Sequence, residues 1–226
     1  MGDLNISGYD IFLHPELADE EGLLAAGADL SVQTLILAYS NGIFPWYSDG
    51  SPILWWSPDP RMVLLPEDFK VSKSLLQTIR NKGLDVKFDT YFASVIEQCS
   101  KVMRKGQKGT WITEEMKQAY INLHKEGYAH SVETFKDGQL VGGLYGVSLG
   151  GAFFGESMFY TIRDASKVAL YHLVEKVKRF QFNFIDVQQS TAHLKSLGAK
   201  DLTRSEFLDR LQKALKKDTL RGCWSE

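Results

Sequence analysis

The sequence predicts a mixed α/β protein with a small N-terminal domain and a larger C-terminal domain. Three stretches with strand-like composition follow one another closely over residues 130–159, and a helical pattern, a short apolar strand and a second helical pattern come after them. The 226 residues are 44% hydrophobic and 24% charged, so the chain can bury a sizeable core. An aromatic content of 12% excludes intrinsic disorder and fibrous repeats for the chain as a whole.

Helices separated by one irregular stretch are predicted for the first half of the chain. Ser31 can cap a helix that Asn41 and Gly42 end. Prolines at 45, 52, 58 and 60 exclude a regular helix in the aromatic-rich stretch that follows. Further helices are expected over 72–83, 91–103 and 114–125, with a basic loop at 106–109.

The second half predicts strands at 130–135, 139–149, 152–159 and 182–188, joined first by hairpin turns and then by a helix that Asp164 caps. Thr203 and Glu206 form a capping box for a last helix that ends near residue 215. We expect the N-terminal domain to comprise residues 1–65 and the second domain 66–226, with the boundary between 65 and 110.

Several classes of site are excluded by the sequence. Two cysteines, Cys99 and Cys223, provide neither a disulfide framework nor a cysteine zinc site. The five histidines lack metal-ligand spacing, and no nucleotide-binding glycine motif occurs, so we expect no metal and no cofactor. No signal peptide is expected, and the uncharged stretches 30–48 and 138–155 are interrupted by glycine and polar residues. The sequence thus predicts a cytoplasmic protein with no membrane partner.

Charge is distributed unevenly along the chain. The net charge is −10 over residues 1–69, +5 over 70–128 and +3 over 129–226. An anionic partner would therefore contact the middle and C-terminal parts. A solvated surface of mixed sign is the alternative.

Two carboxylates lie in unusually apolar sequence. Asp186 and Gln188 are two residues apart on a predicted strand and should project from the same side, either as a functional couple or as a satisfied polar pair. Glu156 lies among aromatic residues and needs a cation, which is either an internal arginine such as Arg163 or a cationic substrate. Trp46 and Trp111 lie beside proline and glycine on loops, where they can stack on a nucleobase or belong to the core.

Taken together, these stretches resemble the leucyl/phenylalanyl-tRNA–protein transferases. The matching segments extend over nearly the whole chain and include GIFPW (42–46), ILWWSPDPR (53–61), GTWIT (109–113), LVGGLYG (140–146), GESMF (155–159) and IDVQ (185–188). The resemblance implies a C-terminal domain of the acetyltransferase-like (GNAT) fold that works without coenzyme A. It also implies a cytoplasmic enzyme of the N-degron pathway that moves Leu, Phe or Met from aminoacyl-tRNA to proteins beginning with Lys or Arg.

The resemblance also assigns roles to the candidate residues. Gln188, oriented by Asp186, would align the attacking amine, and Glu156 would bind the cationic acceptor. The terminal adenosine would lie between Trp46 and Trp111, and the pocket for the transferred side chain would be shaped by Phe153, Met158 and Ile185.

For the tRNA itself, the resemblance indicates basic positions in the middle of the chain. Lys73, Arg80 and Lys82 would contact phosphates, whereas Gln77 and Asn81 depart from the basic pattern of the family. We expect a monomer. Two other functions remain open: an N-acyltransferase that uses coenzyme A, which the absence of a pyrophosphate-binding signature disfavours, and a non-catalytic RNA-binding module.

Overall fold

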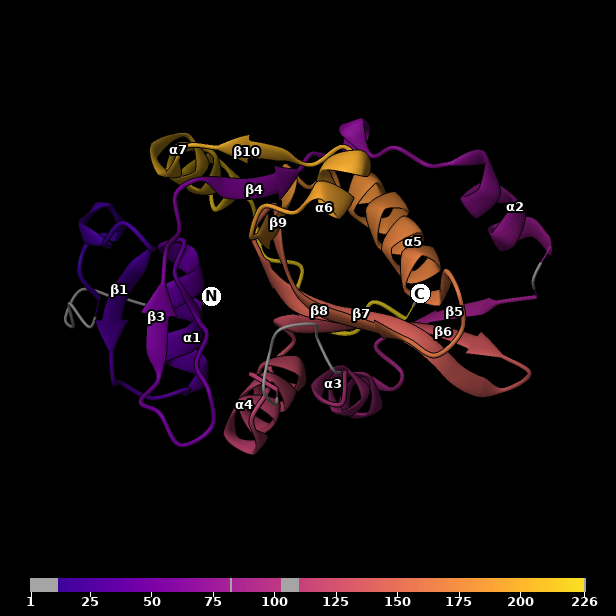
Figure 1. Ribbon diagram of the computed structural model, residues 1–226, viewed down its shortest axis with the longest axis horizontal. Helices are drawn as coiled ribbons and strands as arrows, with labels where there is room; N and C mark the ends of the chain where they lie inside the picture. The colour runs from indigo at the N-terminus through magenta and orange to yellow at the C-terminus, as the bar shows by residue number, and fades with distance from the viewer. Residues whose placement is uncertain (1–11, 82, 103–109, 226) are drawn as a thin grey trace.

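The computed structural model describes residues 12–81, 83–102 and 110–225, and its strands form two separate sheets (Figure 1). The smaller sheet has the antiparallel order β1-β3-β2 and is built from Leu23–Ala26, Leu54–Trp56 and Phe44–Pro45. The aromatic and proline-rich stretch therefore folds as short strands and connecting loops, as expected for a segment in which proline excludes helix.

The larger sheet has seven strands in the order β10-β4-β9-β8-β7-β6-β5. Its strands are β4 (Arg61–Leu64), β5 (Asp85–Phe88), β6 (Ala129–Lys136), β7 (Gln139–Leu149), β8 (Ala152–Tyr160), β9 (Phe184–Gln188) and β10 (Lys200–Leu202). The pairs β4–β9, β5–β6, β6–β7, β7–β8 and β4–β10 are antiparallel, and β8–β9 is parallel. The parallel pair exists because a helix, α5 (Ala165–Arg179), carries the chain back between β8 and β9.

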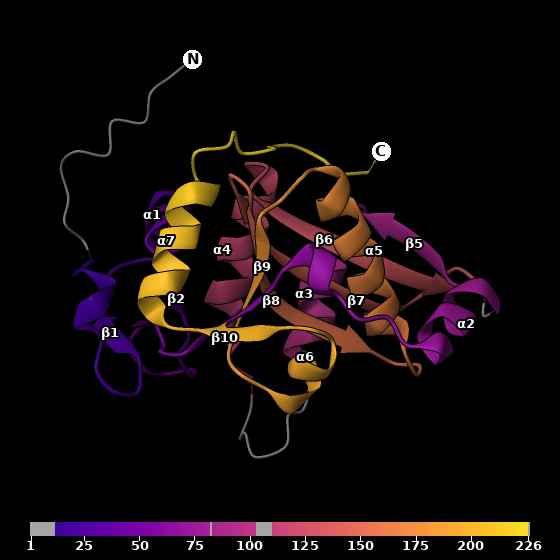
Figure 2. The same cartoon turned by 90° about the horizontal axis from the view of Figure 1, so that it is seen from above.

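Helices cover both faces of the large sheet. The helices are α1 (Val32–Ser40), α2 (Lys73–Asn81), α3 (Phe92–Ser100), α4 (Glu114–Lys125), α5 (Ala165–Arg179), α6 (Ala192–Ser196) and α7 (Arg204–Ala214), with short 3-10 turns at Pro15–Leu17 and Pro66–Asp68. Helices α3 and α4 lie against one face and α5 against the other, while α7 lies next to the elements of the small sheet (Figures 1 and 2). The mixed α/β class predicted from the sequence is confirmed.

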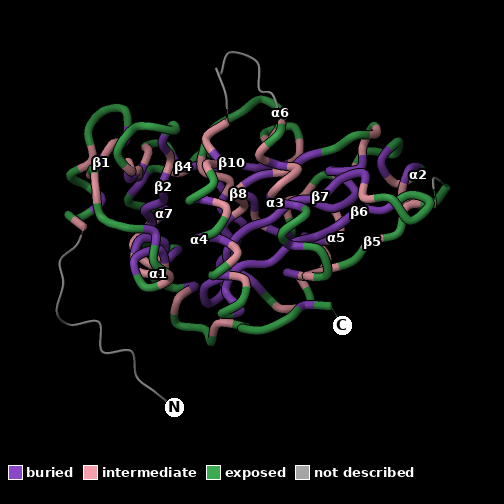
Figure 3. The backbone as a smooth tube through the Cα atoms, turned by 90° about the horizontal axis from the view of Figure 1, so that it is seen from below, coloured by how far each residue is buried: buried purple, intermediate pink, exposed green. Residues whose placement is uncertain are grey.

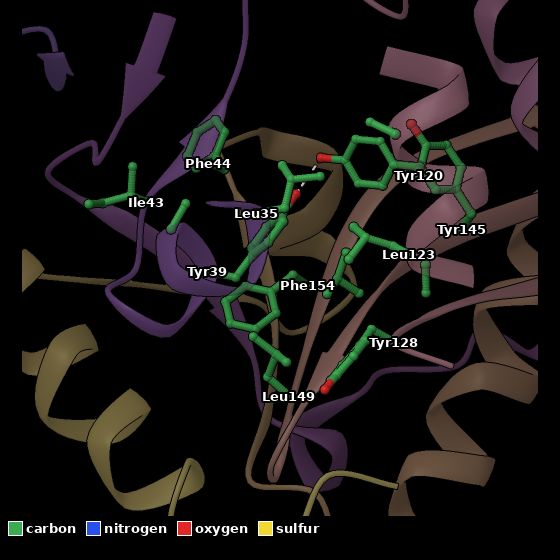
Figure 4. Close-up of a cluster of buried hydrophobic side chains, with 14 of the residues drawn as sticks. Leu35, Tyr39, Ile43, Phe44, Tyr120, Leu123, Tyr128, Tyr145, Leu149 and Phe154 are labelled. Atoms are coloured by element: carbon green, nitrogen blue, oxygen red, sulfur yellow. Dashed lines mark hydrogen bonds between the residues drawn. The ribbon is translucent and has the colours of Figure 1, made fainter. Parts of the chain in front are cut away.

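The core is divided by the large sheet. One cluster joins α1, α3, α4 and the small sheet, and it includes Tyr39, Tyr120 and Phe154 (Figure 4). The other packs the apolar face of α5, including Leu173 and Val177, on the opposite side of the sheet. The buried segments in Figure 3 follow the central strands, whereas exposed segments are concentrated in loops. Both faces of the central strands are therefore covered, which explains their nearly continuous apolar runs.

Most predicted elements are present, with two local corrections. The last apolar strand begins at Phe184 and not at residue 182. Asp164 precedes α5, but it has a left-handed backbone with φ of 70°, its side chain caps no backbone N–H, and its carboxylate pairs with Lys167 at 3.1 Å. The capping box of Thr203 and Glu206 is confirmed.

Short elements were not predicted from the sequence, namely β1, β2, β3, β4, β5, β10 and α6. The predicted domain boundary follows β4, so the segment assigned to the N-terminal domain contributes one strand to the large sheet. The expected basic loop at 106–109 lies outside the described residues.

Candidate active site

A cavity of about 560 Å³ opens between the end of β2, the middle of β7 and β8, the end of β9, and the helices α5 and α6. It is lined by Phe44, Pro45, Trp46, Leu64, Trp111, Leu144, Tyr145, Gly155, Glu156, Ser157, Met158, Leu170, Leu173, Ile185, Val187, Gln188, Gln189, Thr191, His193 and Leu194. Most of these side chains are apolar, and Glu156, Gln188, Gln189 and His193 supply polar groups. Such a composition is typical of a pocket that holds an apolar group and orients it with a few polar contacts.

Asp186 lies directly behind the wall of this cavity and is completely buried. Its carboxylate accepts two hydrogen bonds from Arg61, from Nε to Oδ1 at 2.9 Å and from Nη2 to Oδ2 at 2.7 Å. Both partners have no exposed side-chain surface. Asp186 lies on an otherwise apolar strand, where its charge needs a partner. This bidentate ion pair with Arg61 compensates that charge.

Arg61 also connects the two sheets. Its Nη1 donates to the carbonyl oxygen of Gly42 at 3.1 Å, and its guanidinium lies between the rings of Phe44 and Phe207, at 4.8 and 4.5 Å from their centroids. Gly42 has φ of 74°, and a Cβ there would lie 2.8 Å from the Phe207 ring. Glycine is therefore needed for the loop to approach Arg61 this closely.

Gln188 ends β9 in a left-handed conformation, with φ of 56°. Its backbone N–H donates to Asp186 Oδ1 at 3.0 Å, and its side-chain Nε2 donates to Glu156 Oε1 at 3.5 Å. The pairing of β9 with β4 shifts register here, between Met62 and Val63. The expectation that the Asp186 and Gln188 side chains share one face needs correction, because only Gln188 lines the cavity and Asp186 contacts its backbone. The expectation assumed a regular strand, in which residues i and i+2 project from the same side, but β9 is irregular at Gln188.

Glu156 is half-buried in the cavity wall, and its partners differ from those considered in the sequence. Tyr39 Oη donates to Oε1 at 2.7 Å, and Tyr120 Oη donates to Oε2 at 3.1 Å. Arg163 is 89% exposed and pairs with Asp164, so it is not the internal cation that the sequence left open for Glu156. Burial raises the pKa of Glu156 to about 7, and the two tyrosine hydrogen bonds limit the rise.

The two tryptophans lie at the cavity, each half-buried. Trp46 follows β2 and packs against Trp56 with ring centroids 5.7 Å apart, and its carbonyl oxygen accepts a hydrogen bond of 2.6 Å from Trp56 Nε1. Trp111 precedes α4, whose N-cap is Thr113. Both rings contribute surface to one cavity although 65 residues separate them in the sequence.

The apolar part of the cavity includes two of the three predicted side chains. Met158 and Ile185 line it, together with leucines of β7 and α5. Phe153 does not line the cavity, since it is completely buried and packs against Trp224 at a centroid distance of 5.9 Å. Phe153 and Met158 pack in the same core cluster, so the two side chains differ in how deeply they are buried and not in the face of the sheet.

Two of the three predicted phosphate-binding residues, Lys73 and Arg80, lie on α2, far from the small sheet in Figure 1. Lys73 and Arg80 are exposed, whereas Leu75 and Thr78 of the same helix are buried, so the helix presents a basic face to solvent. Lys82 lies outside the described residues.

Among the described residues, no group of three or more histidine, cysteine or acidic side chains is arranged to hold a metal ion. None of the helices described is long and apolar enough to cross a membrane.

The comparison with protein-family models identifies the chain over most of its length. Residues 28–59 match the leucyl/phenylalanyl-tRNA protein transferase N-terminal domain, and residues 63–212 match the leucyl/phenylalanyl-tRNA protein transferase model. The chain belongs to this family. The resemblance inferred from the sequence is thereby confirmed, and the chain is an aminoacyltransferase.

Two individual transferases agree with this assignment. The leucyl/phenylalanyl-tRNA–protein transferase of Myxococcus xanthus is 52% identical over 217 residues, which cover 96% of this chain and 93% of that protein. The corresponding transferase of Desulfatibacillum aliphaticivorans is 54% identical over 214 residues, covering 95% and 92%. A solved ribosomal-protein-alanine N-acetyltransferase from Brucella melitensis biovar Abortus superposes with a TM-score of 0.36 at 14% identity, covering 49% of this chain and 82% of that one.

Three side chains at the site were missed as functional candidates in the sequence. Tyr39 and Tyr120 lie on the apolar faces of their helices, where an aromatic residue indicates only core. A buried tyrosine hydroxyl requires a partner, but the partner lies 117 residues from Tyr39 and 36 from Tyr120. Arg61 could have been identified from the sequence as the partner of a buried carboxylate, because it is the only Lys or Arg among residues 1–69 and begins an apolar segment.

Proposed function

We propose that the cavity is where a leucyl or phenylalanyl group leaves tRNA and joins the α-amine of a protein that begins with Lys or Arg. The observation that supports this most strongly is the arrangement of Gln188 and Glu156, which meet at 3.5 Å in the wall of an otherwise apolar cavity. Transfer from an ester to an amine needs orientation of both reactants and removal of protons from nitrogen. A fixed amide and a carboxylate at the edge of an apolar pocket meet these requirements.

The apolar part of the cavity would hold the transferred side chain. Met158 and Ile185 provide flexible and branched apolar surface there. Leu, Phe and Met all fit such a surface, and a single methylene changes binding by about 1–3 kcal/mol. Phe153 would act behind this surface as part of the core.

The terminal adenosine of the tRNA would stack on Trp46 and Trp111 at the cavity mouth. Each ring offers a flat face that accepts any base. The basic face of α2, with Lys73 and Arg80, would contact phosphates of the acceptor stem, and Lys82 belongs to the same proposal. These contacts add affinity without reading sequence.

At the reaction centre, Gln188 would align the attacking amine, and Asp186 would act through the backbone of Gln188 and not through its side-chain amide. Glu156 would bind the cationic N-terminus of the acceptor. No metal and no cofactor takes part in this proposal. We further propose that the enzyme works as a monomer in the cytoplasm within the N-degron pathway, and that its N-terminal domain comprises residues 1–65 and the second domain 66–226.

The experiment is incubation of the protein with radiolabelled Leu-tRNA and a peptide that begins with Arg, followed by product analysis. We expect a Leu-Arg peptide, and no product from the same peptide acetylated at its N-terminus. Binding of tRNA without any product would favour the RNA-binding module. Consumption of an acyl-coenzyme A in place of the aminoacyl-tRNA would favour the small-molecule N-acyltransferase. A peptide that begins with Asp serves as the specificity control.

A further inference from the structure

The carboxylate of Glu156 and the hydroxyls of Tyr39 and Tyr120 form a closed triangle of hydrogen-bond contacts. Tyr39 Oη contacts Oε1 at 2.7 Å, and Tyr120 Oη contacts Oε2 at 3.1 Å. The two hydroxyls also contact each other directly, as Figure 4 shows. Both tyrosines are completely buried, on α1 and α4, whereas Glu156 reaches the cavity from β8. The triangle therefore has one corner open to a substrate and two corners in the core.

With Glu156 ionised, the triangle has one hydrogen fewer than it has contacts. Each tyrosine hydroxyl has one hydrogen, and an ionised carboxylate has none, so two hydrogens must serve three contacts. A third hydrogen on Glu156 would complete all three contacts at once. The site is thus built to receive one proton, and the only corner of the triangle that lines the cavity is Glu156.

The other charged groups around Glu156 have opposing effects. Asp186 on β9 raises the pKa of Glu156, and Arg61 on β4 lowers it, while burial is the largest cause of its rise to about 7. Burial also raises the pKa of both tyrosine hydroxyls well above their ordinary value, so that they remain hydrogen donors near neutral pH. A carboxylate in this state can be either ionised or protonated at the pH of a cell.

We infer that Glu156 is the proton acceptor for the α-ammonium group of the acceptor protein, with Tyr39 and Tyr120 as positioning residues that hold the carboxylate in the cavity wall. This inference rests on the proposed function and deepens it, since the proposal itself requires only that Glu156 bind a cation. The side-chain amide of Gln188 donates from Nε2 to Glu156 Oε1 at 3.5 Å, so it lies beside the carboxylate that would receive the proton.

The proposed step begins with the α-amine of the acceptor as an ammonium group. One of the three ammonium protons passes to the Glu156 carboxylate, and the neutral nitrogen attacks the ester carbonyl carbon of the aminoacyl-tRNA. The carbon–nitrogen bond forms, the carbon–oxygen bond to the terminal ribose breaks, and a second proton moves from nitrogen to the departing ribose oxygen. The third proton stays on the new amide, and Glu156 later releases its proton to water.

The test is the pH dependence of kcat at saturating Leu-tRNA and Arg-peptide, where kcat reports groups of the enzyme–substrate complex. For Tyr39→Phe and Tyr120→Phe we expect the acid limb to move up by about one pH unit, because loss of a donor to a charged group raises the pKa of the carboxyl. Glu156→Gln should lower kcat by about 100-fold and remove the limb. The matched control is Tyr128→Phe, which removes a hydroxyl from the same core cluster away from Glu156.

A second measurement leaves the packing of the two helices unchanged. Uniform replacement of tyrosine by 3-fluorotyrosine makes the phenols stronger donors, so the limb should move to lower pH, opposite to the phenylalanine variants. Identical limbs in wild type, both phenylalanine variants and the fluorinated protein would overturn the inference, as would a wild-type limb in Glu156→Gln. Absence of Leu-Arg product from the wild type at every pH would instead refute the proposed function.

Discussion

Replacing Arg61 by Met should destabilise the protein more than any exposed ion pair could. The change leaves the Asp186 carboxylate completely buried with the backbone N–H of Gln188 as its remaining hydrogen-bond donor. Removing one partner of a buried pair costs about 3–5 kcal/mol, because the other charge stays in the interior without compensation. Arg61 also loses its position between the rings of Phe44 and Phe207. We expect the free energy of unfolding to fall by about 4 kcal/mol.

The assay is equilibrium unfolding in urea, followed by tryptophan fluorescence. With a denaturant slope of about 2.5 kcal/mol per molar, a loss of about 4 kcal/mol lowers the midpoint by about 1.5 M. The control is Lys200→Met, which breaks the ion pair between Lys200 and Asp68. The side chain of Lys200 is 63% exposed and that of Asp68 is 37% exposed. That change should cost less than about 1 kcal/mol.

The double variant Arg61→Met with Asp186→Leu separates charge from packing. Because it removes both charges, much of the lost stability should return, since a buried pair and an apolar replacement are often of similar stability. Transfer activity should not return, because Gln188 would still lack the carboxylate that accepts from its backbone. An Arg61→Met variant within about 1 kcal/mol of the wild type would show that the pair does not have the energetic role argued above.

Four further results are expected. Gln188→Ala should lower the single-turnover transfer rate by about 100-fold while the tRNA affinity stays unchanged in filter binding; a wild-type rate would remove Gln188 from the reaction. Trp46→Ala should weaken binding of Leu-tRNA by about 1–3 kcal/mol, which a fluorescence titration measures, and unchanged affinity would exclude stacking. Lys73→Gln and Arg80→Gln should each reduce the slope of log affinity against log salt by about one; equal slopes would exclude phosphate contacts of α2. Glu156→Gln should be about 2 kcal/mol more stable than the wild type at pH 8 but equal to it at pH 4.5. The reason is that a carboxyl whose pKa in the folded protein is raised to about 7 loses its stabilising contribution as the pH rises through that value. Parallel curves of urea stability against pH for the two proteins would contradict this.

The longer elements could be predicted from local sequence because each has a local cause. Helix α1 begins where Ser31 accepts from the backbone N–H of Thr34, and α7 begins with a capping box, both of which depend on residues within one turn. The hairpin strands β6 and β7 are long and are joined at Asp137 and Gly138, which have left-handed backbones. By contrast, β10 has three residues and depends on its pairing with β4, where the partner of Asp201 is Met62, 139 positions earlier.

The site illustrates the same limit more sharply. Strand periodicity indicated Asp186 and Gln188 as candidate site residues. It could not predict the register shift of the β4–β9 pair, which separates their side chains. The sequence identified Glu156 as a carboxylate that needs a partner, yet the partners proved to be tyrosine hydroxyls on two distant helices. The hydrophobic pattern predicts that Tyr39 and Tyr120 are buried, but it does not predict where their hydroxyl groups point.

The position of Arg61 has a consequence for how the loop before Trp46 and the end of β9 can change in evolution. One guanidinium holds the carbonyl of Gly42, four residues before Trp46, and the carboxylate of Asp186, two residues before Gln188. The spacing between the two walls of the cavity is therefore fixed within the folded chain before any substrate arrives. An insertion between Gly42 and Trp46, or between Asp186 and Gln188, would displace one wall of the cavity relative to the other. Each segment must therefore keep its length, even though the two are far apart in the gene.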